Sequence, residues 1–117
     1  MERLPIIKIG QILFVSIQID LQDDSVLQLQ EDLADELVAT RARGVIIDIT
    51  AVEIVDSFIG RMLATIGSIS RLFDAETVIV GMRPAVAITL TELGLSLNGV
   101  RTALNAEKGL ALLNRRA

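Results

Sequence analysis

The sequence contains no cysteine, histidine, tryptophan or tyrosine. Without cysteine, the chain can form neither disulfide bonds nor thiolate metal sites. Without histidine, it lacks the usual general base near neutral pH and the commonest metal ligand in proteins. The two lysines, Lys8 and Lys108, stand in ordinary contexts, so aspartate, glutamate, serine, threonine and arginine remain as the reactive groups. These absences argue against an enzyme without excluding one, because carboxylates alone can catalyse reactions.

Positive charge and aromatic side chains are also scarce. The net charge is −4, the isoelectric point is about 4.7, and the aromatic residues are 3 phenylalanines. With no basic stripe and few rings to stack on bases, we expect no nucleic-acid binding. No stretch of about 18 residues lacks both charge and proline, so we expect no membrane span. No small-residue cleavage site follows the first apolar run, so we expect no signal peptide and a cytoplasmic protein.

Aliphatic residues are what the sequence has in quantity. Hydrophobic residues make up 51% of the 117 residues, and the mean hydropathy is +0.55. This content is enough to build a hydrophobic core, and we expect one domain over residues 1–117. Two interpretations of the high hydropathy stay open: an aliphatic-rich core, or apolar patches that remain exposed and bind other proteins.

Hydrophobic periodicity predicts an alternation of strands and helices. The predicted strands are Pro5–Gly10, Gln11–Ile19, Val45–Thr50, Glu76–Val80 and one short strand within Leu97–Leu104. The predicted helices begin at Ser25, after Asp56, at Pro84 and after Asn105. The order β-β-α-β-α-β-α-β-α predicts a single α/β domain, with a mixed, mostly parallel sheet packed by about four helices. Val45–Thr50 is apolar on both alternating sets, which is typical of a central strand covered on both faces.

The ends of the first helix have recognisable signals. Ser25 and Gln28 fit a capping box, with Ser25 at the N-cap. Arg41 and Arg43 are expected in the last turn, where positive charge suits the helix dipole, and Gly44 is expected to end the helix in a left-handed conformation.

Small residues form a stripe along the helix that follows Asp56. Gly60, Ala64 and Gly67 are separated by four and three positions, and interior glycine costs about 1 kcal/mol relative to alanine. Something should therefore approach this stripe closely, either the chain's own sheet or a partner.

Asp48 and Ser57 are the polar residues that need an explanation. A carboxylate at Asp48, within an apolar strand, must have partners, either backbone N–H groups of a neighbouring loop or a role in catalysis. Ser57 could simply cap its helix, and Asp56 could do so equally well. Alternatively, Ser57 is a phosphorylation site at a helix N-terminus, where Asp56 and Glu53 would oppose the added charge and the helix dipole would favour it.

Nucleotide-binding and hydrolase motifs are missing. There is no Walker sequence, no GxGxxG after a strand and no GxSxG elbow around Ser57. The loop Gly81-Met82-Arg83, followed by Pro84 at a helix start, could accept an anion, but loops of this kind are common in α/β domains.

Two stretches resemble the signatures of STAS domains, the anti-sigma-factor antagonist family. The first is Val45-Ile46-Ile47-Asp48-Ile49-Thr50…Asp56-Ser57-Phe58, and the second is Gly81-Met82-Arg83-Pro84-Ala85-Val86…Leu93-Gly94-Leu95. The resemblance covers essentially the whole chain. Within the family, the chain is most similar to the single-domain, RsbS-type antagonists of bacterial stressosomes. Two segments carry this similarity: Asp-Ser-Phe and Pro-Ala-Val-Ala-Ile-Thr-Leu-Thr-Glu-Leu-Gly-Leu.

The resemblance implies a signalling role without catalysis or a cofactor. Such proteins assemble with RsbR-type STAS co-antagonists into a large scaffold that holds an RsbT-type serine kinase. The kinase phosphorylates the serine that matches Ser57 and is released, and a phosphatase resets the site. Asp56 and Asp48 would support this site, whereas Gly81, Arg83 and Thr89 would face an anion or a partner. A homodimer and a large hetero-assembly are expected, with no membrane, nucleic-acid or metal partner.

Three alternatives remain at the level of the sequence. The first is a ligand- or nucleotide-binding STAS module, supported only by the loop at Gly81. The second is a minor enzyme that uses Asp48, Glu53 and Asp56 with a divalent metal. The third is a soluble STAS partner of a transporter.

Overall fold

The protein forms one five-stranded sheet with helices on both of its faces. The structure is a computed structural model, and it describes residues 4–18, 23–94, 97 and 99–115. In chain order the elements are β1 (Ile6–Ile9), β2 (Ile12–Ser16), α1 (Asp23–Thr40), β3 (Gly44–Asp48), α2 (Ser57–Leu72), β4 (Glu76–Val80), α3 (Pro84–Glu92), β5 (Val100–Ala103) and α4 (Ala106–Asn114). The order predicted from periodicity is confirmed.

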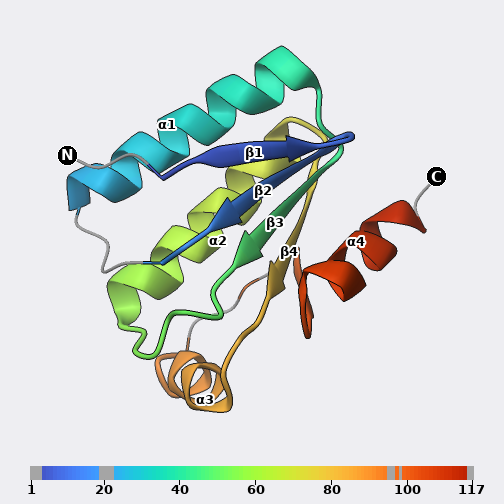
Figure 1. Cartoon of the computed structure of the whole chain (residues 1–117). Helices are drawn as coiled ribbons and strands as arrows, with labels where there is room; N and C mark the ends of the chain where they lie inside the picture. Colours follow the sequence, from blue (N-terminus) through green and yellow to red (C-terminus); the bar gives the residue numbers. More distant parts are fainter. Residues whose placement is uncertain (1–3, 19–22, 95–96, 98, 116–117) are drawn as a thin grey trace.

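The strands lie in the order β1-β2-β3-β4-β5 (Figure 1). The opening hairpin pairs β1 with β2 in the antiparallel sense, and each later strand is parallel to its neighbour. β3 is therefore the central strand. Its residues Val45, Ile46 and Ile47 are completely buried, because helices cover both faces of the sheet at this point.

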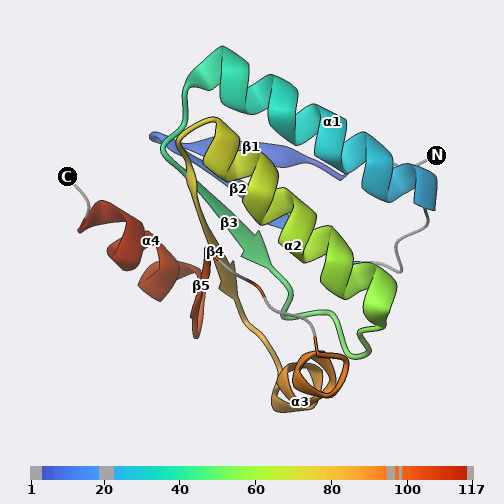
Figure 2. The ribbon, with the colours of Figure 1, turned by 180° about the vertical axis from the view of Figure 1, so that it is seen from behind.

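Two hydrophobic layers hold the helices on the sheet. Figures 1 and 2 show α1 and α2 side by side on one face and α4 on the other. The layer under α1 and α2 is the larger, and it is built around Leu13, Leu33, Ile47 and Leu63. The smaller layer under α4 holds five buried side chains: Ile12, Ile46, Val78, Val80 and Leu113. α3 lies beyond the carboxyl ends of β3 and β4 (Figure 2).

The helix boundaries differ from the predictions at α1. The helix begins at Asp23, so Ser25 lies within it and is not the N-cap. Ser25 was predicted as the N-cap because it precedes the first apolar residue of the helix, but a helix can begin with polar residues ahead of that point. The helix ends at Thr40, where Arg41 takes the left-handed conformation with φ of 53°. The last turn contains no basic residue. Gly44 instead opens β3, where an added Cβ would lie 2.7 Å from a methyl carbon of Leu113.

Arg43 joins the amino-terminal edge of the sheet to α4. Its guanidinium donates to the backbone oxygen of Leu113 and to Oδ1 of Asn114, both at 2.6 Å. Arg43 was predicted to interact with the dipole of α1 at its last turn. It instead binds Leu113, which lies 70 residues further along the sequence.

The small-residue stripe of α2 packs against the chain's own sheet. Gly60 and Gly67 are buried, and a Cβ at Gly67 would lie 2.5 Å from Cγ2 of Val100, at the start of β5. The stripe thus serves close helix–sheet packing, which was one of the two alternatives. Separately, within the described residues, no helix is long and apolar enough to cross a membrane.

Candidate functional site

Ser57 is the first residue of α2, and Asp56 is its N-cap. Oδ1 of Asp56 accepts the backbone N–H of Ile59 at 3.0 Å, and the backbone oxygen of Asp56 accepts the N–H of Gly60 at 3.1 Å. Asp56 therefore satisfies the first turn with both its side chain and its main chain. Of the two possible caps, the structure selects Asp56.

The Ser57 hydroxyl is left without a structural task. The residue is partly exposed, and no described residue forms a hydrogen bond with its hydroxyl. The hydroxyl oxygen lies at the N-terminus of a 16-residue helix, where free N–H groups and the helix dipole favour negative charge. The N–H groups and the helix dipole would thus stabilise a phosphate on this oxygen.

Asp48 organises the loop that leads from β3 to Ser57. Its Oδ1 accepts the backbone N–H of Thr50 at 2.8 Å and the Thr50 hydroxyl at 2.6 Å. The carboxylate thus has the backbone N–H partner that was expected, in the turn directly after its own strand. We missed Thr50 in the sequence, although the spacing Asp-x-Thr at a strand end is typical of such a side-chain turn.

Thr50 also ties this loop to the loop after β4. Its backbone oxygen accepts the Nε–H of Arg83 at 3.0 Å. Gly81 faces the same threonine with φ of +74°, and a Cβ there would overlap the Thr50 hydroxyl oxygen. The two stretches that carry the family resemblance, about 30 residues apart in the sequence, therefore touch through Thr50.

The remaining predicted residues are only partly engaged. Within the described part of the chain, the other guanidinium nitrogens of Arg83 form no hydrogen bond or ion pair. The Thr89 hydroxyl donates to the Ala85 backbone oxygen at 3.0 Å, within α3. Arg83 thus keeps free donors at an exposed position, whereas the Thr89 hydroxyl is occupied by its own helix.

Apolar surface lies beside the serine. Ile54, in the loop before α2, is 85% exposed, and an open groove of about 370 Å³ between α1 and α2 begins at Phe58. The groove is lined by Val26, Leu27, Gln30, Phe58, Arg61, Met62 and Thr65. An exposed isoleucine and an open groove of this kind are features of a protein-docking surface.

The acidic residues that the structure describes do not gather into a metal site. Among the described residues, no group of three carboxylates, histidines or cysteines is placed to hold an ion. The Asp48 carboxylate is engaged with Thr50, and the Asp56 carboxylate is engaged with the first turn of α2. Asp48, Glu53 and Asp56 are therefore not gathered into a metal-binding group.

Comparison with known proteins decides the family. The model of the STAS domain matches residues 3–107. The chain belongs to the STAS domain family. A curated relative, the RsbT co-antagonist protein RsbRA of Bacillus subtilis, is 32% identical over 83 residues, which are 71% of this chain and 30% of RsbRA. The match thus spans less than a third of that relative's length.

Two solved structures resemble the STAS domain over nearly its whole length. One is RsbS of Moorella thermoacetica, in a form with one serine replaced by glutamate. It is 42% identical, with a TM-score of 0.85, over 97% of this chain and 96% of that chain. The other is a chain from a structure of the stressosome, which is described as a signal integration and transduction hub. It is 44% identical, also with a TM-score of 0.85, over 96% and 97% of the two chains.

Proposed function

We propose that this STAS domain is a non-catalytic antagonist and scaffold in a bacterial stress-signalling complex, the stressosome. In this role it holds a switch kinase until Ser57 is phosphorylated. The observation that carries the proposal is the division of tasks at the start of α2, where Asp56 caps the helix and the Ser57 hydroxyl is left free. The resemblance to RsbS and to a stressosome chain at more than 40% identity supports the complex in which this occurs.

The modification has a defined chemistry. The kinase transfers the γ-phosphoryl group of ATP to Oγ of Ser57, and ADP and the hydroxyl proton leave. The phosphate adds about −1.5 to −2 charges beside the exposed carboxylates of Glu53 and Asp56. The helix N-terminus favours the added charge, so the fold survives while the docking surface around Ile54 becomes strongly negative.

The other predicted residues have supporting roles in this proposal. Asp48 holds the loop through Thr50, and Gly81 allows the second loop to approach the same threonine. Arg83 offers its free guanidinium donors to the phosphate or to a partner carboxylate. Thr89 is the weakest of the predicted partner-facing residues, because its hydroxyl is already bonded within α3.

The proposed partners follow from the family and its relatives. They are an RsbT-type serine kinase, a cognate phosphatase and RsbR-type co-antagonists, together with further copies of the chain in a homodimer and a large hetero-assembly. The similarity to the RsbT co-antagonist protein RsbRA and to a stressosome chain supports co-assembly. The proposed location is the cytoplasm, over a single STAS domain of residues 1–117.

The test is phosphate mapping after incubation with the cognate kinase and ATP. Intact mass should show one added phosphate, and peptide mapping should place it on Ser57. Ser57→Ala should remove the label, whereas Thr89→Ala, which alters another hydroxyl near this end of the sheet, should not. Labelling of Ser57→Ala at the wild-type level would overturn the proposal.

A further inference from the structure

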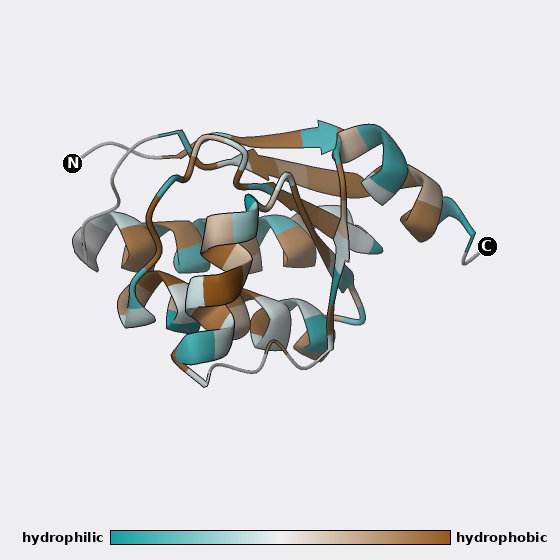
Figure 3. Cartoon of the chain, turned by 90° about the horizontal axis from the view of Figure 1, so that it is seen from below, coloured by the Kyte–Doolittle hydropathy of each residue, from teal (hydrophilic) through white to brown (hydrophobic). Residues whose placement is uncertain are grey.

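β1 is an edge strand with an unusual distribution of side chains. Among the described strands it pairs with β2 alone, so no described strand covers its outer edge. Ile7 and Ile9 lie on the α4 side of the sheet, since they stand opposite Phe14 and Ile12, and they are 53% and 46% exposed. α4 packs on β3, β4 and β5, and Figure 3 shows strands rich in hydrophobic residues that continue past that helix. An edge of this kind is suited to pairing with another strand.

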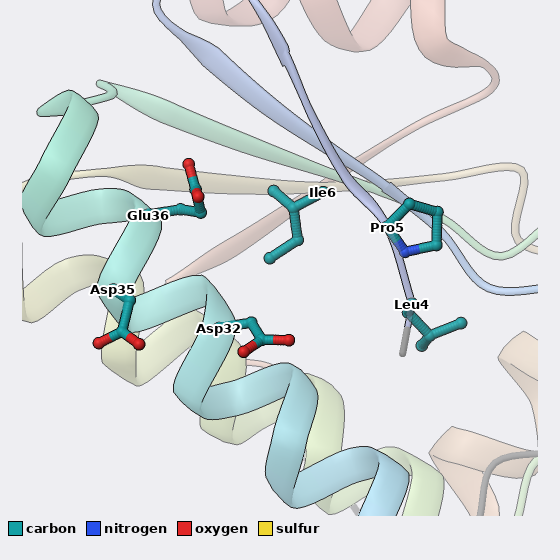
Figure 4. Close-up of a pocket in the computed structure, with 6 residues that line it drawn as sticks. All are labelled: Leu4, Pro5, Ile6, Asp32, Asp35 and Glu36. Carbon is teal, nitrogen blue, oxygen red and sulfur yellow. The ribbon is translucent and has the colours of Figure 1, made fainter. Parts of the chain in front are cut away.

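The opposite face of β1 carries charge. Lys8 stands opposite Leu13 and therefore points to the side of α1 and α2. It is exposed, and no described carboxylate lies within ion-pair distance of it. A groove of about 370 Å³ separates β1 from α1, and its acidic residues are Asp32, Asp35 and Glu36. Figure 4 shows Asp32 and Glu36 extending from α1 into the space beside Ile6.

We infer that a second copy of the chain pairs with β1 in the antiparallel sense, about a two-fold axis at Ile7. In this register Lys8 of one copy stands opposite Ile6 of the other, at the rim of the partner's acidic groove. Each copy contributes one cation and one cluster of carboxylates, so the contact is self-complementary in charge, as a two-fold interface requires.

The backbone supports the same register. The hairpin turn at Gly10 and Gln11 is closed by the pair Ile9–Ile12, so Ile7 and Ile9 direct their backbone groups to β2. Ile6 and Lys8 then direct theirs to the outer edge. When Lys8 of one copy pairs with Ile6 of the other, the outward N–H and C=O groups of the two residues face each other. The two-fold axis repeats this pair, so it occurs once on each side of the axis. The two Ile7 side chains meet at the axis on the α4 side, where they cover each other.

The other edge of the sheet lacks these features. The exposed central residues of β5 are Arg101 and Thr102, and the Arg101 guanidinium is already paired with Glu76 at 3.2 Å. β5 therefore serves as the internal control for pairing through β1. The inference deepens the proposed function and rests on the homodimer proposed there. The phosphorylation of Ser57 and its test do not depend on which strand forms the dimer, so the two can fail separately.

Disulfide trapping tests the register directly, because the wild-type chain has no cysteine. Ile7→Cys should form a covalent dimer on mild oxidation of the native protein, because the two residues 7 face each other in a non-hydrogen-bonded pair with Cα atoms about 4.5 Å apart. Ile9→Cys should not, since the two residues 9 would stand about 13 Å apart along the strands. Thr102→Cys on β5 is the matched edge control. Trapping of Ile7→Cys no better than Thr102→Cys would overturn the inference.

Charge reversal gives an independent readout. Lys8→Glu should raise the dimer dissociation constant at least about tenfold in sedimentation experiments, because a carboxylate then faces the acidic groove. Combining it with Glu36→Lys should recover part of the affinity, and circular dichroism should confirm that both variants are folded. A wild-type chain that stays monomeric at all concentrations, or a Lys8→Glu variant that dimerises as well as wild type, would contradict the contact.

Discussion

Asp56 and Ser57 are neighbours with different tasks. The Asp56 carboxylate holds the first turn of α2, and the Ser57 hydroxyl has no partner among the described residues. This arrangement suits the proposed switch, because phosphorylation of Ser57 would remove no native hydrogen bond. The first turn would therefore stay intact when the surface charge changes.

The division of tasks predicts different stability effects at the two positions. Asp56→Ala should lower the free energy of unfolding by about 1 kcal/mol, because it removes an N-cap. Ser57→Ala should change it by less than about 0.5 kcal/mol, because it removes no native hydrogen bond. Urea unfolding of the two variants beside wild type makes the comparison. An equal loss in both would show that Ser57 shares the capping role.

A negative charge at position 57 should be tolerated by the fold. Ser57→Asp places a carboxylate in the first turn of α2, where the helix dipole stabilises it by about 0.3–1 kcal/mol, partly offset by repulsion from Asp56. We expect a thermal midpoint close to that of wild type. Ser57→Lys is the control, because it should be the less stable of the two, and the reverse order would contradict the dipole argument.

The two loops at the carboxyl ends of β3 and β4 act as one unit through Thr50. Gly81 has a left-handed backbone and no space for a Cβ beside Thr50, whereas Gly10 has a similar φ of +60° with nothing within 4 Å. Gly10→Ala should therefore cost about 1 kcal/mol for the backbone alone. Gly81→Ala should cost at least about 1 kcal/mol more, because its Cβ also collides with Thr50. Equal costs in denaturant unfolding would show that Thr50 can move away freely.

The contact between α2 and β5 is equally tight. Gly67→Ala should destabilise the protein by about 1–3 kcal/mol, since its Cβ would overlap Val100. In the background of Val100→Ala, the same change should cost markedly less, so a double-mutant cycle should give a favourable coupling. If the effects of the two changes on the free energy of unfolding are additive, the destabilisation by Gly67→Ala does not come from overlap with Val100.

Periodicity alone predicted the architecture of the molecule. The predicted bounds of β4 match the structure, and the predicted bounds of β3 differ by one residue at the start and two at the end, because long apolar runs leave little choice of element. The signals at the ends of α1 were misread. Helix ends depend on short-range backbone geometry, which a single polar residue such as Ser25 does not determine.

The candidate site was predicted in part. The sequence indicated Ser57, Asp56 and Asp48, and the structure explains how the last two support the loop and the helix. The link from Thr50 to Arg83 was missed because it joins residues 33 positions apart and depends on the register of two parallel strands. For the same reason the contact of Arg43 with the end of α4 was not foreseen.

Across the whole molecule, the proposed interactions use separate surfaces. Ser57, Ile54 and Arg83 lie at the carboxyl ends of the parallel strands, whereas Ile7 and Lys8 lie on the outer strand of the sheet. A copy bound at β1 would thus leave the serine open to the kinase. This separation would allow the proposed scaffold to be phosphorylated while it stays assembled.

The most direct test of the switch is the affinity of the cognate kinase for the protein before and after phosphorylation. A titration calorimeter or fluorescence anisotropy can follow both forms, with Ser57→Ala treated in the same way as the control. We predict that phosphorylation raises the dissociation constant at least about tenfold, which corresponds to about 1.4 kcal/mol. Ser57→Ala should bind like the unmodified protein before and after treatment. Equal affinity of the kinase for the phosphorylated and unphosphorylated wild type would contradict the account.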